Sequence, residues 1–260
     1  MGLRTNFYNV FILIDNESQG ENNILFQKQI GLQHRRRDGQ GEIVKSSCFQ
    51  AEKSYNILKF IKLTRVMMDR WRRIREFIQK EMAGEQIAGT DHLERAYEWC
   101  QKVGRARGAD MEILLTAALL HDIGVPIDRK RHYEAALPKA RAFLGELGFK
   151  EDEIKKILHV IEAHSRYGGP DPQTLEAKIL QDVDAIEYVG AVGLMRGVVR
   201  ALHERSFSGK IEETPRLIDD LIKRVEGNFY TEEAKRIVEK RITFLKAFSD
   251  RLKKELAGEE

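Results

Sequence analysis

Cysteine is scarce in this 260-residue chain, which holds only Cys48 and Cys100. Two cysteines so far apart match neither the spacing of a thiolate metal site nor a disulfide framework. This argues against a zinc ribbon and against a small disulfide-stapled secreted domain. A reducing, cytoplasmic setting is therefore the expected one.

Long apolar runs are missing as well. No stretch of the sequence approaches the roughly 18 residues that a helix needs to span a bilayer. The opening MGLRTNFYNVFILID contains a short apolar stretch, but no small-residue cleavage site follows it, so we do not interpret it as a secretory signal. The sequence predicts no membrane partner.

A strong excess of one charge is also absent. The chain carries 44 Lys/Arg and 41 Asp/Glu, a formal net charge of +3. The surplus lies in residues 1–66, with 10 basic against 6 acidic residues, whereas the rest holds 34 against 35. A main domain without a basic surplus or interleaved aromatic residues disfavours nucleic acid as a partner.

Residues 1–66 differ from the rest in composition. They contain six of the seven asparagines and the Gln- and Gly-rich stretch QKQIGLQHRRRDGQGE. Two interpretations stay open: a poorly structured extension, or a mispredicted start upstream of a natural start at Met67 or Met68. In either case the folded domain is expected over residues 67–260.

Alternating β-branched runs between turn residues are missing from residue 67 onward, so the expected fold is all-α. Helical periodicity and the glycines between segments predict helices over 68–83, 91–107, 110–122, 132–147, 151–164, 173–205, 214–226 and 231–257. The segment 110–122 is apolar on all sides, which is typical of a central, buried helix.

This central segment ends in His121 and Asp122. A buried carboxylate needs a partner, and a metal ion satisfies imidazole and carboxylate together. A His–Asp hydrogen bond in the core is the alternative. His92 lies on an inward stripe of its helix, although it could be a packed histidine. Asp184 also faces inward, while Asp182 points about 160° away on the same helix.

The order His92, His121-Asp122, Asp184 resembles the H…HD…D pattern of the HD-domain superfamily of metal-dependent phosphohydrolases. The resemblance extends over most of 67–260 through H-x-x-R (92–95), LLHDIG (119–124), EAHS (162–165), KILQDVDAIEYVGAVGLMR (178–196) and YTEEAKRIVEKRITFLKAF (230–248). The tail over 230–248 resembles the closing helices of one subgroup, the small soluble bacterial and archaeal HD hydrolases. One departure is Ala185, where many relatives have arginine, which removes a basic residue near the expected site.

The resemblance implies an all-α HD bundle with a buried metal site made by His92, His121, Asp122 and Asp184. This donor set suits Mn²⁺, Fe²⁺, Co²⁺, Ni²⁺ or Zn²⁺, and Mg²⁺ less well. One divalent ion is expected. His132 and His164 could hold a second, but His132 follows the HD pair closely for that arrangement.

The implied reaction is hydrolysis of a phosphate ester or anhydride in a nucleotide or similar small phosphorylated metabolite, by metal-activated water. Asp122 and Asp128 are the expected catalytic residues, although Asp128 could simply cap a turn. His164 lies beside the apolar stripe of its helix, whereas His159 lies nearly opposite and is expected at the surface. The expected substrate-binding residues are Arg95, Lys130, His132, His164 and Arg166; a solvated turn is the alternative for the run 129–132.

Two other functions stay open. A di-iron HD oxygenase would need two irons and six protein ligands, so the metal count separates it from a one-metal hydrolase. A non-catalytic, nucleotide-binding HD regulator would have no need for the complete H…HD…D set. A homodimer could form through the amphipathic final helices.

Overall fold

The computed structural model describes residues 68–259, which are helical and contain no strand. The all-α fold class is therefore confirmed. Both interpretations of residues 1–66 concern positions outside the described residues. Within the described part, no helix is long and apolar enough to cross a membrane.

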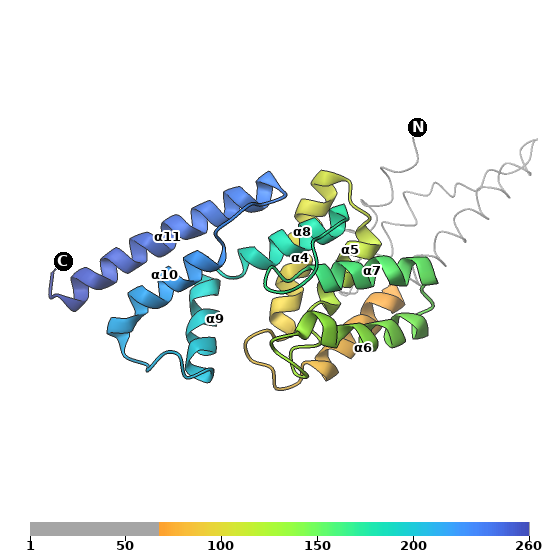
Figure 1. Cartoon of the computed structure of the whole chain (residues 1–260), viewed down its shortest axis with the longest axis horizontal. Helices are drawn as coiled ribbons and strands as arrows, with labels where there is room; N and C mark the ends of the chain where they lie inside the picture. The colour runs from red at the N-terminus through yellow and green to blue at the C-terminus, as the bar shows by residue number, and fades with distance from the viewer. Residues whose placement is uncertain (1–67, 260) are drawn as a thin grey trace, which may run out of the picture. The chain divides into compact units, whose positions relative to one another are not determined.

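The described chain begins with a helix over residues 68–81. The remaining elements, in chain order, are α4 (Thr90–Arg107), α5 (Met111–Leu120), α6 (His132–Glu146), α7 (Glu151–Ala163), α8 (Leu175–Ile186), α9 (Gly190–His203), the short 3₁₀ helix η1 (Ile211–Glu213), α10 (Thr214–Arg224) and α11 (Glu232–Leu256) (Figure 1).

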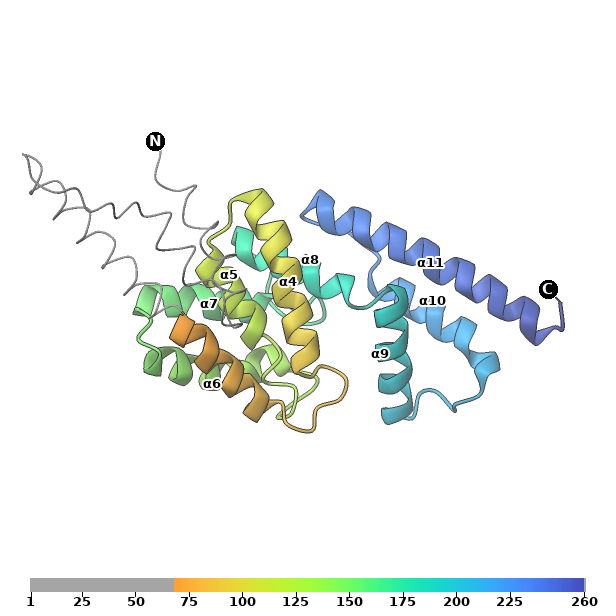
Figure 2. The same ribbon diagram turned by 180° about the vertical axis from the view of Figure 1, so that it is seen from behind.

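Helix α5 is the central helix of the first half, as its composition predicts. Every residue from Ile113 to Leu120 is buried, and α5 packs against α4, α7 and α8 (Figure 2). The Asp110 side chain accepts hydrogen bonds from the backbone N–H groups of Glu112 and Ile113, which caps the helix. The helix ends at Leu120, so His121 and Asp122 lie in the turn that follows.

The single helix expected over 173–205 is wrong: the chain breaks there into α8 and α9. Val189 is extended, and Gly190 has a φ of +80°, a conformation that favours glycine. The carbonyls freed at the break are bound by an arginine of α11, because Arg241 Nη1 donates to Ile186 O at 2.6 Å. The periodic sequence pattern predicts a continuous helix here. In the structure, a hydrogen bond from a distant side chain takes the place of the helical hydrogen bonds at the break.

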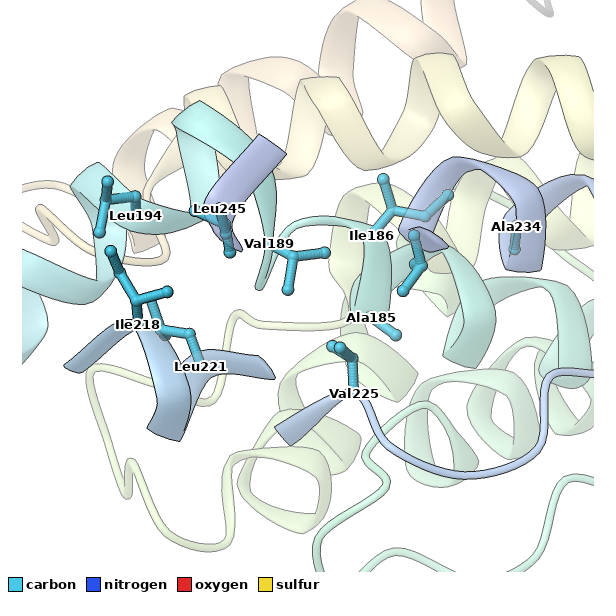
Figure 3. Close-up of a cluster of buried hydrophobic side chains, with 10 residues drawn as sticks. Ala185, Ile186, Val189, Leu194, Ile218, Leu221, Val225, Ala234 and Leu245 are labelled. Carbon is cyan, nitrogen blue, oxygen red and sulfur yellow. The ribbon is translucent and has the colours of Figure 1, made fainter. Parts of the chain in front are cut away.

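The C-terminal helices share their own apolar cluster with the end of α8. Figure 3 shows its side chains converging from α8, α9, α10 and α11; the members are Ala185, Ile186, Val189, Leu194, Ile218, Leu221, Val225, Ala234, Val238 and Leu245. Gly197 permits the close approach of α9 to α10, since a Cβ there would lie 2.8 Å from Leu221 Cδ1. This cluster places α9 and α10 beside the carboxyl end of α8, where Asp184 lies.

Candidate metal centre

Four side chains from three parts of the fold meet at one buried point. His92 lies in the first turn of α4, His121 and Asp122 directly follow α5, and Asp184 lies in the last turn of α8. The two histidines are fully buried, and Asp122 and Asp184 are only 7% and 9% exposed. These are the four residues that the sequence predicts as ligands.

Their donor atoms converge. His92 Nε2 lies 3.3 Å from His121 Nε2, 3.4 Å from Asp122 Oδ2 and 3.4 Å from Asp184 Oδ1. His121 Nε2 lies 3.5 Å from Asp122 Oδ2. Two imidazole nitrogens and two carboxylate oxygens facing one another in this way match the donor chemistry of a divalent transition metal. The residues present therefore fit such an ion.

A second group of donors lies around the other oxygen of Asp122. Asp122 Oδ1 lies 3.4 Å from His132 Nε2 and 3.5 Å from His164 Nε2, and these two nitrogens are 3.1 Å apart. The described residues thus contain two clusters with metal-ligand geometry, joined through Asp122. Each cluster offers three mutually close protein donors, and Asp184, 3.4 Å from His92 Nε2, adds a fourth to the first.

Three of the four histidines are oriented by their own backbone. Their Nδ1 atoms lie close to the carbonyl three residues earlier: 2.8 Å from Ala118 O for His121, 3.1 Å from Arg129 O for His132, and 2.5 Å from Ile161 O for His164. A proton on Nδ1 then donates to that carbonyl. The Nε2 lone pair is left to face the cluster, which is the tautomer that a metal requires.

The electrostatics of the first cluster favour a cation at its centre. Burial raises the pKa of Asp184, but the contact with His92 outweighs burial and lowers it to about 2. Burial lowers the pKa of His92, yet Asp122, Asp184 and Glu187 outweigh burial and raise it to about 10. Burial lowers the pKa of His121 to about 4. The ionised carboxylates hold positive charge between them, which a metal ion can supply instead.

A cavity of about 1190 Å³ opens onto this centre. Asp122, Asp184 and His132 line it at the metal end, and α9 and α10 supply much of the remaining wall. Its cationic lining residues are Arg129, Lys130, Arg196, Arg200, Arg216, Lys223 and Arg224. The volume slightly exceeds the roughly 300–1,000 Å³ that small-molecule sites usually occupy.

The remaining predicted site residues fall into two sets. Lys130 and His132 line the cavity, and His164 is buried beside Asp122 as expected. Arg95, Asp128 and Arg166 do not line it. Their substrate-binding or catalytic roles stay predictions.

Each of these three residues makes contacts outside the cavity. Arg95 pairs with Asp91 and Glu187, and Arg166 donates to Asp182 at 3.1 Å. The exposed Asp128 accepts hydrogen bonds from the N–H groups of Lys130 and Arg131, which is the turn-capping alternative. His159 is partly exposed and accepts from the Gln173 N–H, away from the site.

Sequence reasoning missed Glu187, Tyr188 and the α9 arginines. Glu187 is buried against His92, and Tyr188 and Arg200 line the cavity. A signal for Glu187 was present, because it follows Asp184 by one helical turn and so shares its face. Nothing in the spacing placed α9 at the cavity, since its position depends on the break at Val189 and Gly190.

Comparisons with known proteins agree with this architecture. Residues 89–189 match the family model described as "HD domain". The YpgQ protein of Bacillus subtilis is 27% identical over 194 residues, which cover 71% of this chain and 93% of YpgQ. Ribonuclease Y of Clostridium perfringens (strain SM101) is 40% identical over 79 residues, only 14% of its own length.

Solved structures share the fold. The crystal structure of B. subtilis YpgQ in complex with ADP superposes with a TM-score of 0.55 at 22% identity, covering 73% of this chain and 96% of YpgQ. A predicted HD superfamily hydrolase from an uncultured Thermotogales bacterium has a TM-score of 0.53 at 23% identity, with 71% and 92% covered. At these identities the likeness shows the fold alone.

Proposed function

Because this chain belongs to the HD-domain family, with a divalent-metal donor cluster in its core, we propose that it is a metal-dependent phosphohydrolase. Its substrate in this proposal is a nucleotide or a similar small phosphorylated metabolite. The bond cleaved is a phosphate ester or anhydride.

The observation that carries the proposal is the convergence of His92, His121, Asp122 and Asp184 at the end of a large cavity. A divalent ion bound by these side chains would supply Lewis-acid activation of water and of a phosphoryl oxygen. The chain supplies the rest: His132 lies at the junction of centre and cavity, 18% exposed. From there its imidazole can exchange a proton with a molecule in the cavity.

The cavity lining supports a small anionic substrate. Lys130, Arg216, Lys223 and Arg224 line it, and within residues 68–259 their side chains form no hydrogen bond or ion pair. Cations free to bind a ligand in this way are suited to phosphate oxygens. The ADP bound to YpgQ, a protein of the same fold, supports a nucleotide as the first class to test.

One test measures release of phosphate and pyrophosphate by the full chain. The protein is stripped of metal, then supplied in turn with Mn²⁺, Co²⁺, Ni²⁺, Fe²⁺, Zn²⁺ or Mg²⁺ and with nucleoside mono-, di- or triphosphates. We expect activity with a transition metal and none in Asp122→Ala. Equal release by wild type and variant would contradict the proposal, because the product would then come from elsewhere.

Asp122 and the five side chains grouped with it keep the di-iron oxygenase as a second candidate. The two donor groups contain five residues, and Asp184, 3.4 Å from His92 Nε2, makes six, the number of protein ligands that such an enzyme needs. Oxygen consumption by the iron-loaded protein, without phosphate release, would favour it. A nucleotide-binding regulator predicts instead saturable binding and neither reaction.

We further propose a homodimer, since Phe244 and Phe248 on α11 are exposed large apolar side chains. Sedimentation of the wild type and of Phe244→Ser/Phe248→Ser tests this. A monomeric wild type at micromolar concentration would contradict it.

A further inference from the structure

His92 differs from the other three histidines of the centre in how its ring is oriented. It lies in the first turn of α4, where the carbonyl three residues earlier, Gly89 O, already accepts from its own backbone N–H at 2.9 Å. Leu93 N–H donates to the same carbonyl at 3.3 Å. His92 Nδ1 is buried and has no hydrogen-bond partner among the described residues. The local backbone therefore cannot fix its tautomer.

The group that faces His92 Nδ1 is Glu187, whose Oε2 lies 3.6 Å away. The Glu187 side chain is 0% exposed, and its other oxygen, Oε1, also has no hydrogen-bond partner in the described part. Glu187 caps the carboxyl end of α8, one turn after Asp184. The end of α8 therefore supplies both the predicted ligand Asp184 and the Glu187 carboxylate, which faces the Nδ1 side of His92.

Three arginines from three helices surround this carboxylate. Arg95 of α4 donates from Nε to Oε2 at 2.7 Å. Arg196 of α9 and Arg241 of α11 place Nη1 at 3.8 Å from Oε2 and Oε1, respectively. The carboxylate thus lies between three guanidinium groups, one of them within hydrogen-bond distance, and this arrangement holds its oxygens beside His92.

Two of these arginines are anchored to backbone, which fits a structural task better than substrate binding. Arg196 Nε donates to Ile87 O at 2.9 Å and its Nη1 to Glu187 O at 3.2 Å. Arg241 Nη1 donates to Ile186 O at 2.6 Å, on the break between α8 and α9. Both guanidinium groups are thus held where they face the Glu187 carboxylate.

We propose that Glu187 is a positioning residue of the metal centre: it accepts the Nδ1–H of His92 and so keeps the Nε2 lone pair on the ion, while Arg95, Arg196 and Arg241 hold its carboxylate in place. The ion itself rests on the proposed function; the Glu187–His92 contact does not. Helix α11 donates no ligand among the described residues, yet through Arg241 it influences the metal affinity.

The first test compares metal affinity in Glu187→Gln and wild type. The glutamine is nearly isosteric but uncharged, so it attracts the Nδ1–H less strongly. Mn²⁺ is titrated into the metal-free full chain by calorimetry, and the loss expected for a group behind a ligating histidine is about 10–100-fold in affinity. Unchanged affinity in a folded Glu187→Gln would overturn the proposal.

Asp182→Asn is the matched control. Asp182 is buried on the same helix, but its carboxylate holds Arg166 and the N–H groups of Tyr230 and Thr231. We expect a lower Tm with wild-type metal affinity. An equal fall in affinity in both variants would show that the loss comes from general destabilisation of the fold, and it would overturn the proposal. If Glu187→Gln does not fold, Arg241→Gln replaces it, with an affinity loss of several-fold expected.

A second readout needs no metal. In ¹⁵N-histidine-labelled, metal-free protein, the Nδ1 proton of His92 should give a downfield, slowly exchanging signal, because a buried carboxylate accepts it. This signal should disappear or move upfield in Glu187→Gln and persist in Asp182→Asn. Its absence from wild type would overturn the proposal. Its presence in a protein that binds no divalent ion would instead refute the proposed function and leave the contact intact.

Discussion

The two oxygens of Asp122 face two different environments. On the Oδ2 side, His92, His121 and Asp184 enclose a site that their three helices bury almost completely. On the Oδ1 side, His164 is buried, but His132 is 18% exposed and borders the cavity. Each side has three mutually close protein donors, counting Asp122 in both, and Asp184 adds a fourth to the first side through its 3.4 Å contact with His92 Nε2.

The two sides therefore suit two different tasks: the enclosed side suits binding of a metal ion, and the open side suits contact with a substrate. Enclosure and a full donor set favour tight binding, since few solvent ligands remain to be exchanged. Openness with fewer donors favours weaker binding and leaves room for groups of a substrate. A single carboxylate connects the two sides, so changes on one side can be compared with changes on the other.

The largest effect is expected from Asp122→Ala, which removes the residue common to both sides. Metal binding should fall at both clusters, and hydrolysis should drop roughly a thousandfold or more. Circular dichroism should still report a helical protein, because Asp122 lies in a turn after α5. Activity within tenfold of wild type would locate the chemistry elsewhere.

His121→Ala against His132→Ala separates the two sides. Calorimetric Mn²⁺ titration of wild type should show one tight equivalent, with any second equivalent much weaker. His121→Ala should lose the tight equivalent, whereas His132→Ala should lose only the weak one. Two equally tight equivalents in wild type would contradict the expectation of one resident ion and strengthen the oxygenase alternative.

The pH dependence of the metal-free protein isolates the enclosed side. The folded-state pKa of His92 is raised to about 10, above the ordinary 6.5, so its stabilisation is complete below pH 6.5 and is lost as the pH rises through 10. Tm should therefore fall from pH 7 to pH 10. His92→Asn should show a shallower slope, and identical slopes would mean that other groups dominate.

The smallest effect is expected at the cavity rim. Lys130→Ala removes one exposed cation from the lining and should raise KM by about 3- to 10-fold with kcat nearly unchanged, by loss of one phosphate contact. Arg131→Ala is the control, since Arg131 pairs with Glu134 and does not line the cavity. Equal KM changes in the two variants would mean that the effect comes from the loss of positive surface charge in general and not from a phosphate contact of Lys130.

The fold was predictable where the local pattern and the tertiary structure agree. The apolar sequence of α5, with Asp110 before it and a titratable pair after it, predicts a buried helix with a ligand at its end. The pattern failed over 173–205. Helical periodicity continues through Val189 and Gly190, but Arg241, distant in sequence, binds the carbonyls at the break.

The candidate site was predictable for a related reason. Helical geometry predicts inward positions for His92 and Asp184 and places His121-Asp122 at the end of the buried segment. The resemblance to the HD-domain superfamily joins these residues into one predicted ligand set. The relation of His132 to His164 was not predictable in the same way. Their 3.1 Å separation depends on how the turn after Asp122 returns α6 towards the end of α7.

Sequence alone determined the helical class, the central helix and the inward positions of His92 and Asp184, because each follows from residue type and a 3.6-residue period within one segment. The four-residue ligand set came from the resemblance of the sequence to the HD-domain superfamily. Tertiary structure alone decided that Asp122 faces two clusters, that α9 and α10 wall the cavity, and that Glu187 lies behind His92. These features depend on where separate segments meet, and that is set by packing and by long-range contacts such as those of Arg241, not by local periodicity.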